Sequence, residues 1–319
     1  MKLSRNPMSE APPAQVRRLP HTDGEALRPW SRAVHEIVER AVLVDGVAPV
    51  NELGRMALHG KRAGVHWLAS DSTGGGGGGP DDGGHAVLGW AWLDPADSSV
   101  QLVVHPDHRG RGIGTALAEA VVRDAHPHHW WSFGTLPAAA ALAAHLGLHL
   151  ERQLLIMVRD LIAHPQAPPE PLPGVELVPF TPDLTADLVR INAAAFAHHP
   201  EQGAMTVDDV AARVAEPWFD PEGLLFARDT RTEEFLGFHW TKLEEVPGRA
   251  PVGEVYVLGV HPDVHSRGLG RHLLAAGLAH LQSRGAEHVH LYVEADQTRV
   301  VQLYDSASFE VHNRDSSYA

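Results

Sequence analysis

The sequence contains no cysteine among its 319 residues. Disulfide bonds, thiolate nucleophiles and cysteine-ligated zinc are therefore excluded, and any catalytic group must be another residue type. Basic residues are also few, because 26 Lys and Arg stand against 40 Asp and Glu and give a formal charge of −14. Such a charge repels a phosphate backbone and attracts amine-bearing small molecules, so we expect no nucleic-acid partner.

Long apolar runs are missing too. No stretch approaches the ~20 consecutive apolar residues that a membrane-spanning helix needs. The first twenty residues carry basic side chains with no apolar run behind them, which is not the pattern of a signal peptide. We expect residues 1–20 to form a flexible tail. The simplest interpretation is a cytoplasmic monomer without membrane contact.

Histidine is abundant, with 23 residues, and it clusters at 126–131 and 197–202. Neither cluster has the His-x-x-x-His helical spacing, with a carboxylate between, that favours a zinc site. We therefore expect no bound metal and interpret these histidines as surface or packing residues.

Proline crowds residues 163–176, at positions 165, 168, 169, 171 and 173. Such a run forbids a helix and favours a stiff connector, so we predict a linker here between two domains, 21–162 and 177–319. A second break is the run of six glycines at 74–79. This run lacks the Lys-Ser/Thr ending and the helix of a phosphate-binding P-loop, so we expect a flexible loop between two strands.

Both halves follow the same order of predicted elements. In the first half, residues 85–94 and 99–106 are strand-like by residue type, and a helical pattern follows. The second-half strands are 222–229, 234–242, 253–262 and, after a helix, 288–295. This order predicts an α/β fold in which each half is a mixed twisted β-sheet flanked by α-helices.

The two halves also share a stretch of sequence. With Val104 aligned to Val260, eight of the fourteen residues from 104 to 117 are identical to their counterparts from 260 to 273. A run of this length favours an internal duplication of one domain.

Each copy contains a glycine turn between a strand and a helix, with Gly112 and Gly114 in the first and Gly268 and Gly270 in the second. The unpaired N–H groups and partial positive charge of a helix start bind phosphate without a basic side chain. The turn lacks the lysine of a P-loop and does not follow the first strand of its half, as a Rossmann fingerprint does. For either copy alone, a tight turn without a ligand is the alternative.

The residues around the turn are more specific than its glycines. The pattern Arg/Gln-x-x-Gly-x-Gly/Ala after an apolar strand resembles the pyrophosphate-binding loop of the GNAT acetyltransferase superfamily, whose members bind acetyl coenzyme A (acetyl-CoA). Arg109, Gly112 and Gly114 match this pattern fully. In the second copy both glycines match, but His265 stands where Arg or Gln is usual. The resemblance implies two tandem GNAT domains.

A second GNAT-like segment covers residues 291–310. Tyr304 and Phe309 fall at the superfamily's tyrosine and phenylalanine positions, whereas Gln297 replaces the usual Asn and Ser308 the usual Gly. In the superfamily this tyrosine protonates the coenzyme sulfur as it leaves, so the resemblance implies an acid role for Tyr304. The alternative is a helix tyrosine packed under a loop.

Several longer runs narrow the resemblance. They are residues 44–52, 196–203, 216–223, 237–242, 253–260 and 291–294. Together with the paired GNAT-like halves, they closely resemble the mycothiol synthase family of actinobacteria, over nearly everything from Val42 onward. That family transfers acetyl from acetyl-CoA to the cysteinyl amine of 1D-myo-inositol 2-(L-cysteinylamino)-2-deoxy-α-D-glucopyranoside, here cysteinyl-glucosaminyl-inositol, in the last step of mycothiol biosynthesis.

The resemblance implies a general base and a set of substrate contacts. Glu254 matches the family's base, and an α-amine with a reference pKa of about 7.7–8.0 needs only a modest one. The implied substrate contacts are Glu52, Glu201, Lys242, Glu254 and Tyr292. Any one of these glutamates in isolation would be interpreted as a solvated surface charge. Because Glu52 belongs to the first half, the substrate is expected in a cleft between the domains.

For acetyl-CoA, the resemblance implies contacts from strand, turn and helix in each half. In the second half these are Leu258, Gly259, Val260, His265, Ser266, Arg267, Gly268, Leu269, Gly270, Arg271, Gln297, Thr298, Arg299, Val300, Val301 and Gln302. In the first half they are Leu102, Val103, Val104, Gly110, Arg111, Gly112, Ile113, Gly114 and Thr115. A backbone N–H between Leu258 and Val260 is expected to hold the thioester carbonyl, where GNAT strands splay apart.

Ungapped alignment of the halves indicates which one is active. Ser98 takes the position of Glu254, and Ala143 takes that of Tyr304. We therefore expect the C-terminal domain to perform the transfer and the N-terminal domain to bind acetyl-CoA at most. Two alternatives stay open: a GNAT enzyme for another small amine or a peptide N-terminus, and a degenerate CoA-binding protein, which His265 and the substitutions at 297 and 308 favour.

Overall fold

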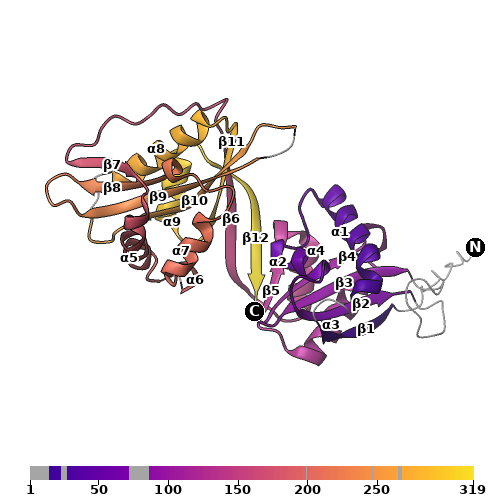
Figure 1. Cartoon of the computed structure of the whole chain (residues 1–319). Helices are drawn as coiled ribbons and strands as arrows, with labels where there is room; N and C mark the ends of the chain where they lie inside the picture. Colours follow the sequence, from indigo (N-terminus) through magenta and orange to yellow (C-terminus); the bar gives the residue numbers. More distant parts are fainter. Residues whose placement is uncertain (1–13, 23–26, 72–85, 199, 246–247, 265–267) are drawn as a thin grey trace, which may run out of the picture. The chain divides into compact units, whose positions relative to one another are not determined.

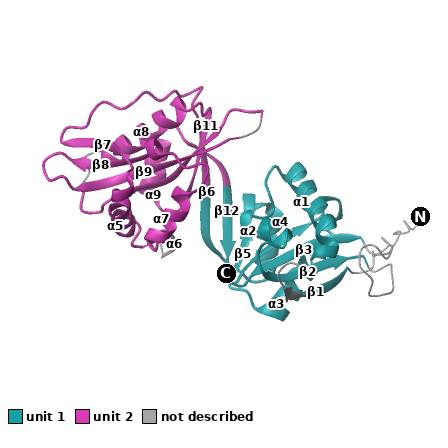
Figure 2. Ribbon diagram, in the orientation of Figure 1, with its two compact units in different colours: residues 1–154, 314–319 teal, residues 155–313 magenta. Residues whose placement is uncertain are grey.

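The computed structural model describes residues 14–22, 27–71, 86–198, 200–245, 248–264 and 268–319. The chain forms two units, unit 1 with residues 1–154 and 314–319 and unit 2 with residues 155–313 (Figures 1 and 2). The predicted α/β fold is confirmed, and each unit contains parallel as well as antiparallel strand pairs. The glycine run at 74–79 lies outside the described residues. None of the described helices is long and apolar enough to span a membrane.

Unit 1 consists of one sheet with helices on both faces. Its strands are β1 (Gln15–Thr22), β2 (Gly64–Ser70), β3 (Val87–Asp94), β4 (Ser99–Val104) and β5 (His129–Ser132), with the start of β6 (Leu150–Asp160) and the end of β12 (Glu310–Tyr318). Its helices are η1 (Arg28–Trp30), α1 (Ser31–Asp45), α2 (Glu52–Leu58), η3 (Pro106–His108), α3 (Ile113–Ala125), η4 (Phe133–Thr135) and α4 (Pro137–His145). The strand order runs β1-β2-β3-β4-β5-β12, with β4 and β5 parallel.

Alternation along these strands sends apolar side chains to both faces of the sheet. On one face, Leu117 of α3 packs with Trp67 in a buried cluster. On the other face, Val34 of α1 packs with Trp90 and Trp92 of β3. Because helices cover both faces, the end of β4 and the start of α3 are held together, which positions the first glycine turn.

Unit 2 repeats this plan. Its strands are β7 (Val175–Pro179), β8 (Leu224–Asp229), β9 (Phe235–Glu244), β10 (Val252–Val260) and β11 (His288–Glu294), and the order β6-β11-β10-β9-β8-β7 places the end of β6 at one edge. Its helices are η5 (Pro182–Leu184), α5 (Thr185–Ala195), α6 (Pro200–Gly203), α7 (Val207–Val214), η6 (Pro221–Gly223), α8 (Leu269–Ser283) and α9 (Thr298–Asp305). Leu278 of α8 packs with Val289 on one face, and Leu188 of α5 packs with Trp240 on the other.

The final strand of the chain ends in unit 1. Ser316 and Tyr318 of β12 pair antiparallel with Ser132 and Trp130 of β5. The buried carboxylate of Asp315 accepts a hydrogen bond from the Gly134 N–H at 2.9 Å. Burial raises the pKa of this carboxyl, although the N–H bond opposes the shift. Residues 314–319 are thus part of the first sheet.

Strand β6 begins in unit 1 and ends in unit 2. Its Leu155 and Met157 are buried in the cluster formed with α8 and α9. Arg159 is buried as well, and its guanidinium donates to the carbonyls of Ala307 and His164, each at 2.9 Å. Burial lowers the pKa of this guanidinium.

These exchanges change the expected domain limits. The expected domain 21–162 includes residues 155–162, which the structure assigns to unit 2. The expected domain 177–319 includes residues 314–319, which the structure assigns to unit 1. The proline pattern at 163–176 marks where regular structure stops, and β7 begins at Val175. The expected tail of residues 1–20 is also too long, because β1 begins at Gln15 and pairs with β2.

Candidate functional site

Both glycine turns have the same backbone geometry. Gly112 precedes α3 with φ 77°, and Gly268 precedes α8 with φ 74°. This left-handed conformation costs a side-chain-bearing residue energy and glycine little. Since a glycine cap has no side chain, the first-turn N–H groups of both helices are left to a ligand or water. His265, Ser266 and Arg267 of the second turn lie outside the described residues.

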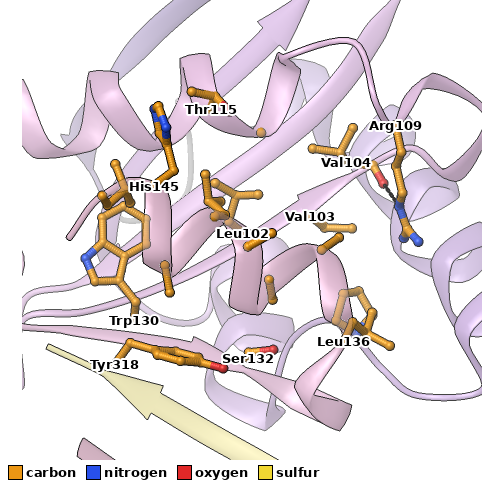
Figure 3. A pocket seen from close by; sticks show the side chains of 18 of the residues that line it. Leu102, Val103, Val104, Arg109, Thr115, Trp130, Ser132, Leu136, His145 and Tyr318 are labelled. Atoms are coloured by element: carbon orange, nitrogen blue, oxygen red, sulfur yellow. Dashed lines mark hydrogen bonds between the residues drawn. The ribbon is translucent and has the colours of Figure 1, made fainter. Parts of the chain in front are cut away.

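In unit 1 the turn opens onto a cavity of about 490 Å³ (Figure 3). Eight of the nine first-half residues expected to bind the coenzyme line it, namely Leu102, Val103, Val104, Gly110, Gly112, Ile113, Gly114 and Thr115. Arg111 is exposed instead and points a guanidinium N–H at the Asp107 carbonyl. Apolar side chains, including Trp130 and Ala143, line much of the rest of the cavity. The cavity therefore combines the N–H groups of the turn with an apolar lining.

Arg109, the basic residue of the turn motif, is already paired. Its guanidinium binds both carboxylate oxygens of Asp45 at 2.7 Å, and its Nε donates to the Val104 carbonyl at 3.2 Å. The bond to Asp45 raises the pKa of Arg109. Because the carboxylate neutralises the guanidinium, the attraction for an anion comes mainly from the backbone of the turn.

In unit 2, three charged or titratable side chains lie side by side on adjacent strands. Glu254 of β10 pairs with Lys242 of β9 and with His290 of β11. Its Oε2 lies 3.6 Å from Lys242 Nζ and 3.8 Å from His290 Nε2. All three side chains are at least 74% buried, with exposures of 15%, 26% and 23%. The Lys242 ammonium also lies 5.5 Å from the centre of the Trp218 ring.

Strands β10 and β11 separate immediately beyond this cluster. Their parallel pairing, in fully described strands, ends at Glu254 and His290. A bulge at Tyr256 shifts the pairing of β10 with β9, and such an extra residue bends a strand. From Leu258 to Val260, β10 pairs with β9. Its other edge is free of β11, where the sequence predicted a carbonyl-binding N–H.

Tyr304 of α9 lies on the opposite face of unit 2 from the Lys242 side chain. It is 6% exposed and packs with Val255 and Leu291 in the cluster under α8. Its ring meets Phe309 at 5.7 Å between centres. Burial raises the pKa of this phenol well above its usual value, so it stays protonated at neutral pH. The packed ring agrees with the alternative of a helix tyrosine in the core. The acid role of its hydroxyl stays a prediction.

The remaining second-half residues that were expected to bind the coenzyme lie at the starts of α9 and α8. Gln297 is the N-cap of α9, and it is exposed together with Thr298, Arg299 and Gln302. Val300 and Val301 turn toward the apolar cluster. At α8, Leu269 is buried and Arg271 exposed. The exposed members of this set are accessible to a ligand.

The register of the sheets aligns the units residue by residue. Ser99 pairs with β3 and β5 as Glu254 pairs with β9 and β11. The ungapped alignment with Ser98 is therefore wrong by one position, because the bulge at Tyr256 adds a residue to β10. Unit 1 thus has a serine, and no carboxylate, at the position of the expected base.

Ala143 of unit 1 occupies the position that Tyr304, the expected acid, has in unit 2. The carbonyl of Ala143 accepts a hydrogen bond from the N–H five residues later at 2.9 Å, and that of Tyr304 does the same at 3.1 Å. Four residues after Ala143 and Tyr304, respectively, Gly147 and Ser308 both have a positive φ, of 75° and 60°. Since Ala143 lines the unit 1 cavity, the missing phenol leaves part of that space open.

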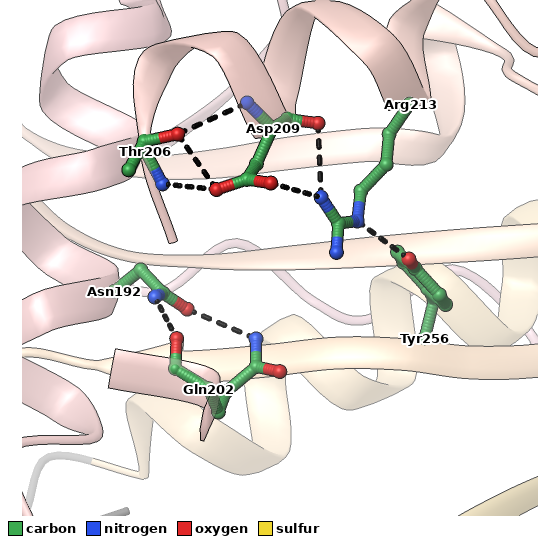
Figure 4. Close-up of polar contacts among 6 residues, drawn as sticks. All are labelled: Asn192, Gln202, Thr206, Asp209, Arg213 and Tyr256. Atoms are coloured by element: carbon green, nitrogen blue, oxygen red, sulfur yellow. Dashed lines mark hydrogen bonds and ion pairs between the residues drawn. The ribbon is translucent and has the colours of Figure 1, made fainter. Parts of the chain in front are cut away.

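The other expected substrate residues differ in their setting. Glu52 is exposed at the first turn of α2 in unit 1. Tyr292 is 51% exposed on β11, and its ring meets that of His290 at right angles. The side chain of Glu201 lies outside the described residues. Its neighbour Gln202 exchanges two hydrogen bonds with the buried Asn192, which ties α6 to α5 (Figure 4).

Several neighbours of the cluster were not predicted. His290 precedes Tyr292 by two residues, so strand alternation could have placed both on one face. Tyr256 packs on Trp218, and its hydroxyl accepts a hydrogen bond from Arg213 at 2.8 Å (Figure 4). No simple sequence signal identifies Arg213. In the part of the chain that the structure describes, no group of three or more metal-ligating side chains is found.

Comparison with known proteins shows which family the chain resembles. The model of the acetyltransferase (GNAT) family matches residues 190–309, and a model of the acetyltransferase (GNAT) domain matches residues 64–147. The chain is similar to the mycothiol acetyltransferase of Propionibacterium freudenreichii, 44% identical over 90% of this chain and 87% of that protein. It is equally similar to that of Nocardia farcinica, 44% identical over 95% and 97% of the two chains.

Solved structures share the fold of both units. A GCN5-related N-acetyltransferase from Sphaerobacter thermophilus is 20% identical, with a TM-score of 0.68 over 95% of this chain and 94% of that one. A tandem GNAT protein from the clavulanic acid biosynthesis pathway is 18% identical, with a TM-score of 0.60 over 95% and 98%. At these identities the likeness is one of fold alone.

Proposed function

The chain belongs to the mycothiol acetyltransferases, a family of acetyl-CoA-dependent enzymes with two GNAT domains, and we propose that unit 2 performs the transfer. The acceptor is the cysteinyl amine of cysteinyl-glucosaminyl-inositol, and the product is mycothiol. The observation that carries this proposal is the position of Glu254, which lies where β10 and β11 separate and beside Lys242.

Glu254 is the general base. Its carboxylate removes a proton from the substrate ammonium, directly or through one water, and the freed amine then attacks the thioester carbonyl. The new N–C bond forms as the C–S bond breaks. Lys242 donates hydrogen bonds to substrate hydroxyls and carries the compensating positive charge, and Glu52, Glu201 and Tyr292 complete the contacts.

Tyr304 is the general acid. Its buried, protonated phenol gives its proton to the departing thiolate and regains one from the acylated nitrogen, which loses its second proton as the amide forms. The free edge of β10 from Leu258 to Val260 supplies the N–H that polarises the carbonyl. The turn before α8 and the start of α9 hold the rest of acetyl-CoA.

Unit 1 binds acetyl-CoA without catalysing transfer. Its cavity of about 490 Å³ combines the first-turn N–H groups of α3 with an apolar lining, which suits a pyrophosphate and a pantetheine arm. Ser99 and Ala143 offer neither a base nor an acid at the equivalent positions. We place the enzyme in the cytoplasm, where acetyl-CoA is available, and expect it to act as a monomer.

Acetylation of purified amines tests this function. The full chain is incubated with acetyl-CoA and cysteinyl-glucosaminyl-inositol, a polyamine, an aminoglycoside or a short peptide, and products are identified by mass spectrometry. Glu254→Gln and Tyr304→Phe should each lower kcat by roughly 100- to 10,000-fold. Ser99→Ala, in the non-catalytic unit, is the matched control and should leave kcat unchanged. Preference for the peptide, or full activity of the double variant, would reject the proposal.

A further inference from the structure

His290 lies at the catalytic cluster with no role assigned so far. It is the β11 partner of Glu254, at the last residue pair before the two strands separate. Its Nε2 lies 3.8 Å from the carboxylate, and 23% of its side chain is exposed. The imidazole therefore touches both the expected base and solvent.

The proton chemistry at Glu254 creates a need for such a group. A carboxylate that takes a proton from an ammonium must lose it again before the next turnover. In model compounds an imidazole binds a proton about two pKa units more tightly than a carboxylate does. An imidazole beside the carboxylate is thus a natural acceptor for that proton.

Resting on the proposed function, we propose that His290 is a positioning residue for the base, which takes the proton from Glu254 and passes it to solvent. The proton moves from the substrate nitrogen to Glu254, then to His290 Nε2, and then to water, which regenerates carboxylate and neutral imidazole. The separation of 3.8 Å exceeds a hydrogen bond, and such contacts commonly shorten when substrate binds.

The groups around His290 fit this path. Glu254 faces it from β10, Lys242 lies on the far side of Glu254 on β9, and the Tyr292 ring stands at right angles to it on its own strand. On the neighbouring β6, the carboxylate of Asp160 interacts with His288. Lys242 competes with protonated His290 for the same carboxylate oxygen, Oε2, which favours release of the proton to water.

Unit 1 provides an internal comparison. His129 takes the same register position on β5, but its β4 partner is Ser99. Its Nδ1 lies 2.8 Å from the Glu151 carboxylate, a partly exposed contact away from any expected base. The fold therefore accommodates a histidine at this position in a unit that has no expected base. Its role depends on the residue that it faces on the neighbouring strand, which is Ser99 in unit 1 and Glu254 in unit 2.

Chemical rescue tests the inference on the full-length enzyme, with whichever amine the wild type acetylates. His290→Ala should lower kcat by on the order of 10-fold, change the KM of both substrates by less than about 2-fold, and regain kcat as imidazole is added. His290→Gln preserves polarity, fills the space and should stay slow with imidazole present. The controls His288→Ala and His129→Ala should behave as wild type.

Three results would overturn the inference. These are an unchanged kcat in His290→Ala, a raised amine KM at unchanged kcat, and a loss that imidazole does not restore although circular dichroism matches wild type. Because His290 acts through Glu254, its replacement in a Glu254→Gln background should cost nothing further. If wild type acetylates some amine but not cysteinyl-glucosaminyl-inositol, the proposed substrate fails while the role of His290 is still decided.

Discussion

The single substitutions Ser308→Gly and Gly147→Ser should change the free energy of unfolding in opposite directions. Both residues occupy the same left-handed position after the last helix of their unit, with φ of 60° and 75°. The left-handed conformation costs an L-residue about 1–2 kcal/mol, and glycine gives back about 0.4–1 kcal/mol through the greater freedom of the unfolded chain. Ser308→Gly should therefore raise the free energy of unfolding by about 1 kcal/mol, and Gly147→Ser should lower it by a similar amount.

Little else changes at either position. Ser308 is exposed, and its N–H bond to the Asp305 carbonyl at 3.0 Å survives in a glycine. A Cβ added to Gly147 meets no atom within 4 Å, so the effect there is confined to the backbone. Differential scanning calorimetry should detect a rise of roughly 2–4 °C in the transition of unit 2 for Ser308→Gly.

A matched control separates backbone conformation from general loss of a serine. Ser306, two residues earlier, has φ −64° and donates its hydroxyl to the Leu303 carbonyl at 2.8 Å. Ser306→Gly should lower the transition temperature, since it removes a hydrogen bond and adds chain entropy. If Ser308→Gly is neutral or destabilising, the argument from backbone strain is refuted.

Three further predictions concern unit 1 and the core of unit 2. Ala143→Tyr should fill the unit 1 cavity, so that calorimetric titration loses one class of acetyl-CoA site while transfer continues; unchanged stoichiometry would contradict the site. Asp45→Asn should cost about 1–2 kcal/mol of stability by weakening its bonds to Arg109, measured by thermal unfolding, and a neutral result would assign the pair no stabilising role. Burial lowers the pKa of His239 to about 4, so the unfolded chain protonates first as pH falls below about 6.5. Stability should therefore drop by about 2 kcal/mol from neutrality to pH 5 in wild type, and a slope that persists in His239→Gln would argue against this source.

Much of the fold was predictable because its signals are local. The strand patterns, the helix after each glycine turn and the duplication all depend on residues close in sequence. The glycines at 112 and 268 both have a positive φ, which is a property of the turn itself. The resemblance to a known family, and not these local patterns, singled out Glu254 and Tyr304, which lie at the separating strands and in the adjacent core.

Features that depend on distant partners were not predictable. The bond between Asp45 and Arg109 joins residues 64 positions apart, and no pattern in either segment signals it. The bulge at Tyr256 adds one residue that no sequence pattern signals, so the alignment placed Ser98 where Ser99 belongs. Likewise, no strand was predicted for β6 or β12, and residue types alone do not tell which strands a given segment pairs with.

Because the end of β12 belongs to unit 1, the sheet of unit 1 can be completed only after nearly the whole chain has been synthesised. When residue 154 leaves the ribosome, β5 still lacks Ser316 and Tyr318, and its backbone edge stays open until almost the whole chain has been translated. An open edge invites pairing with other chains, so the nascent first half is a natural client for chaperones. A gene cut at the proline segment would yield two fragments, each deprived of a strand that only the other encodes.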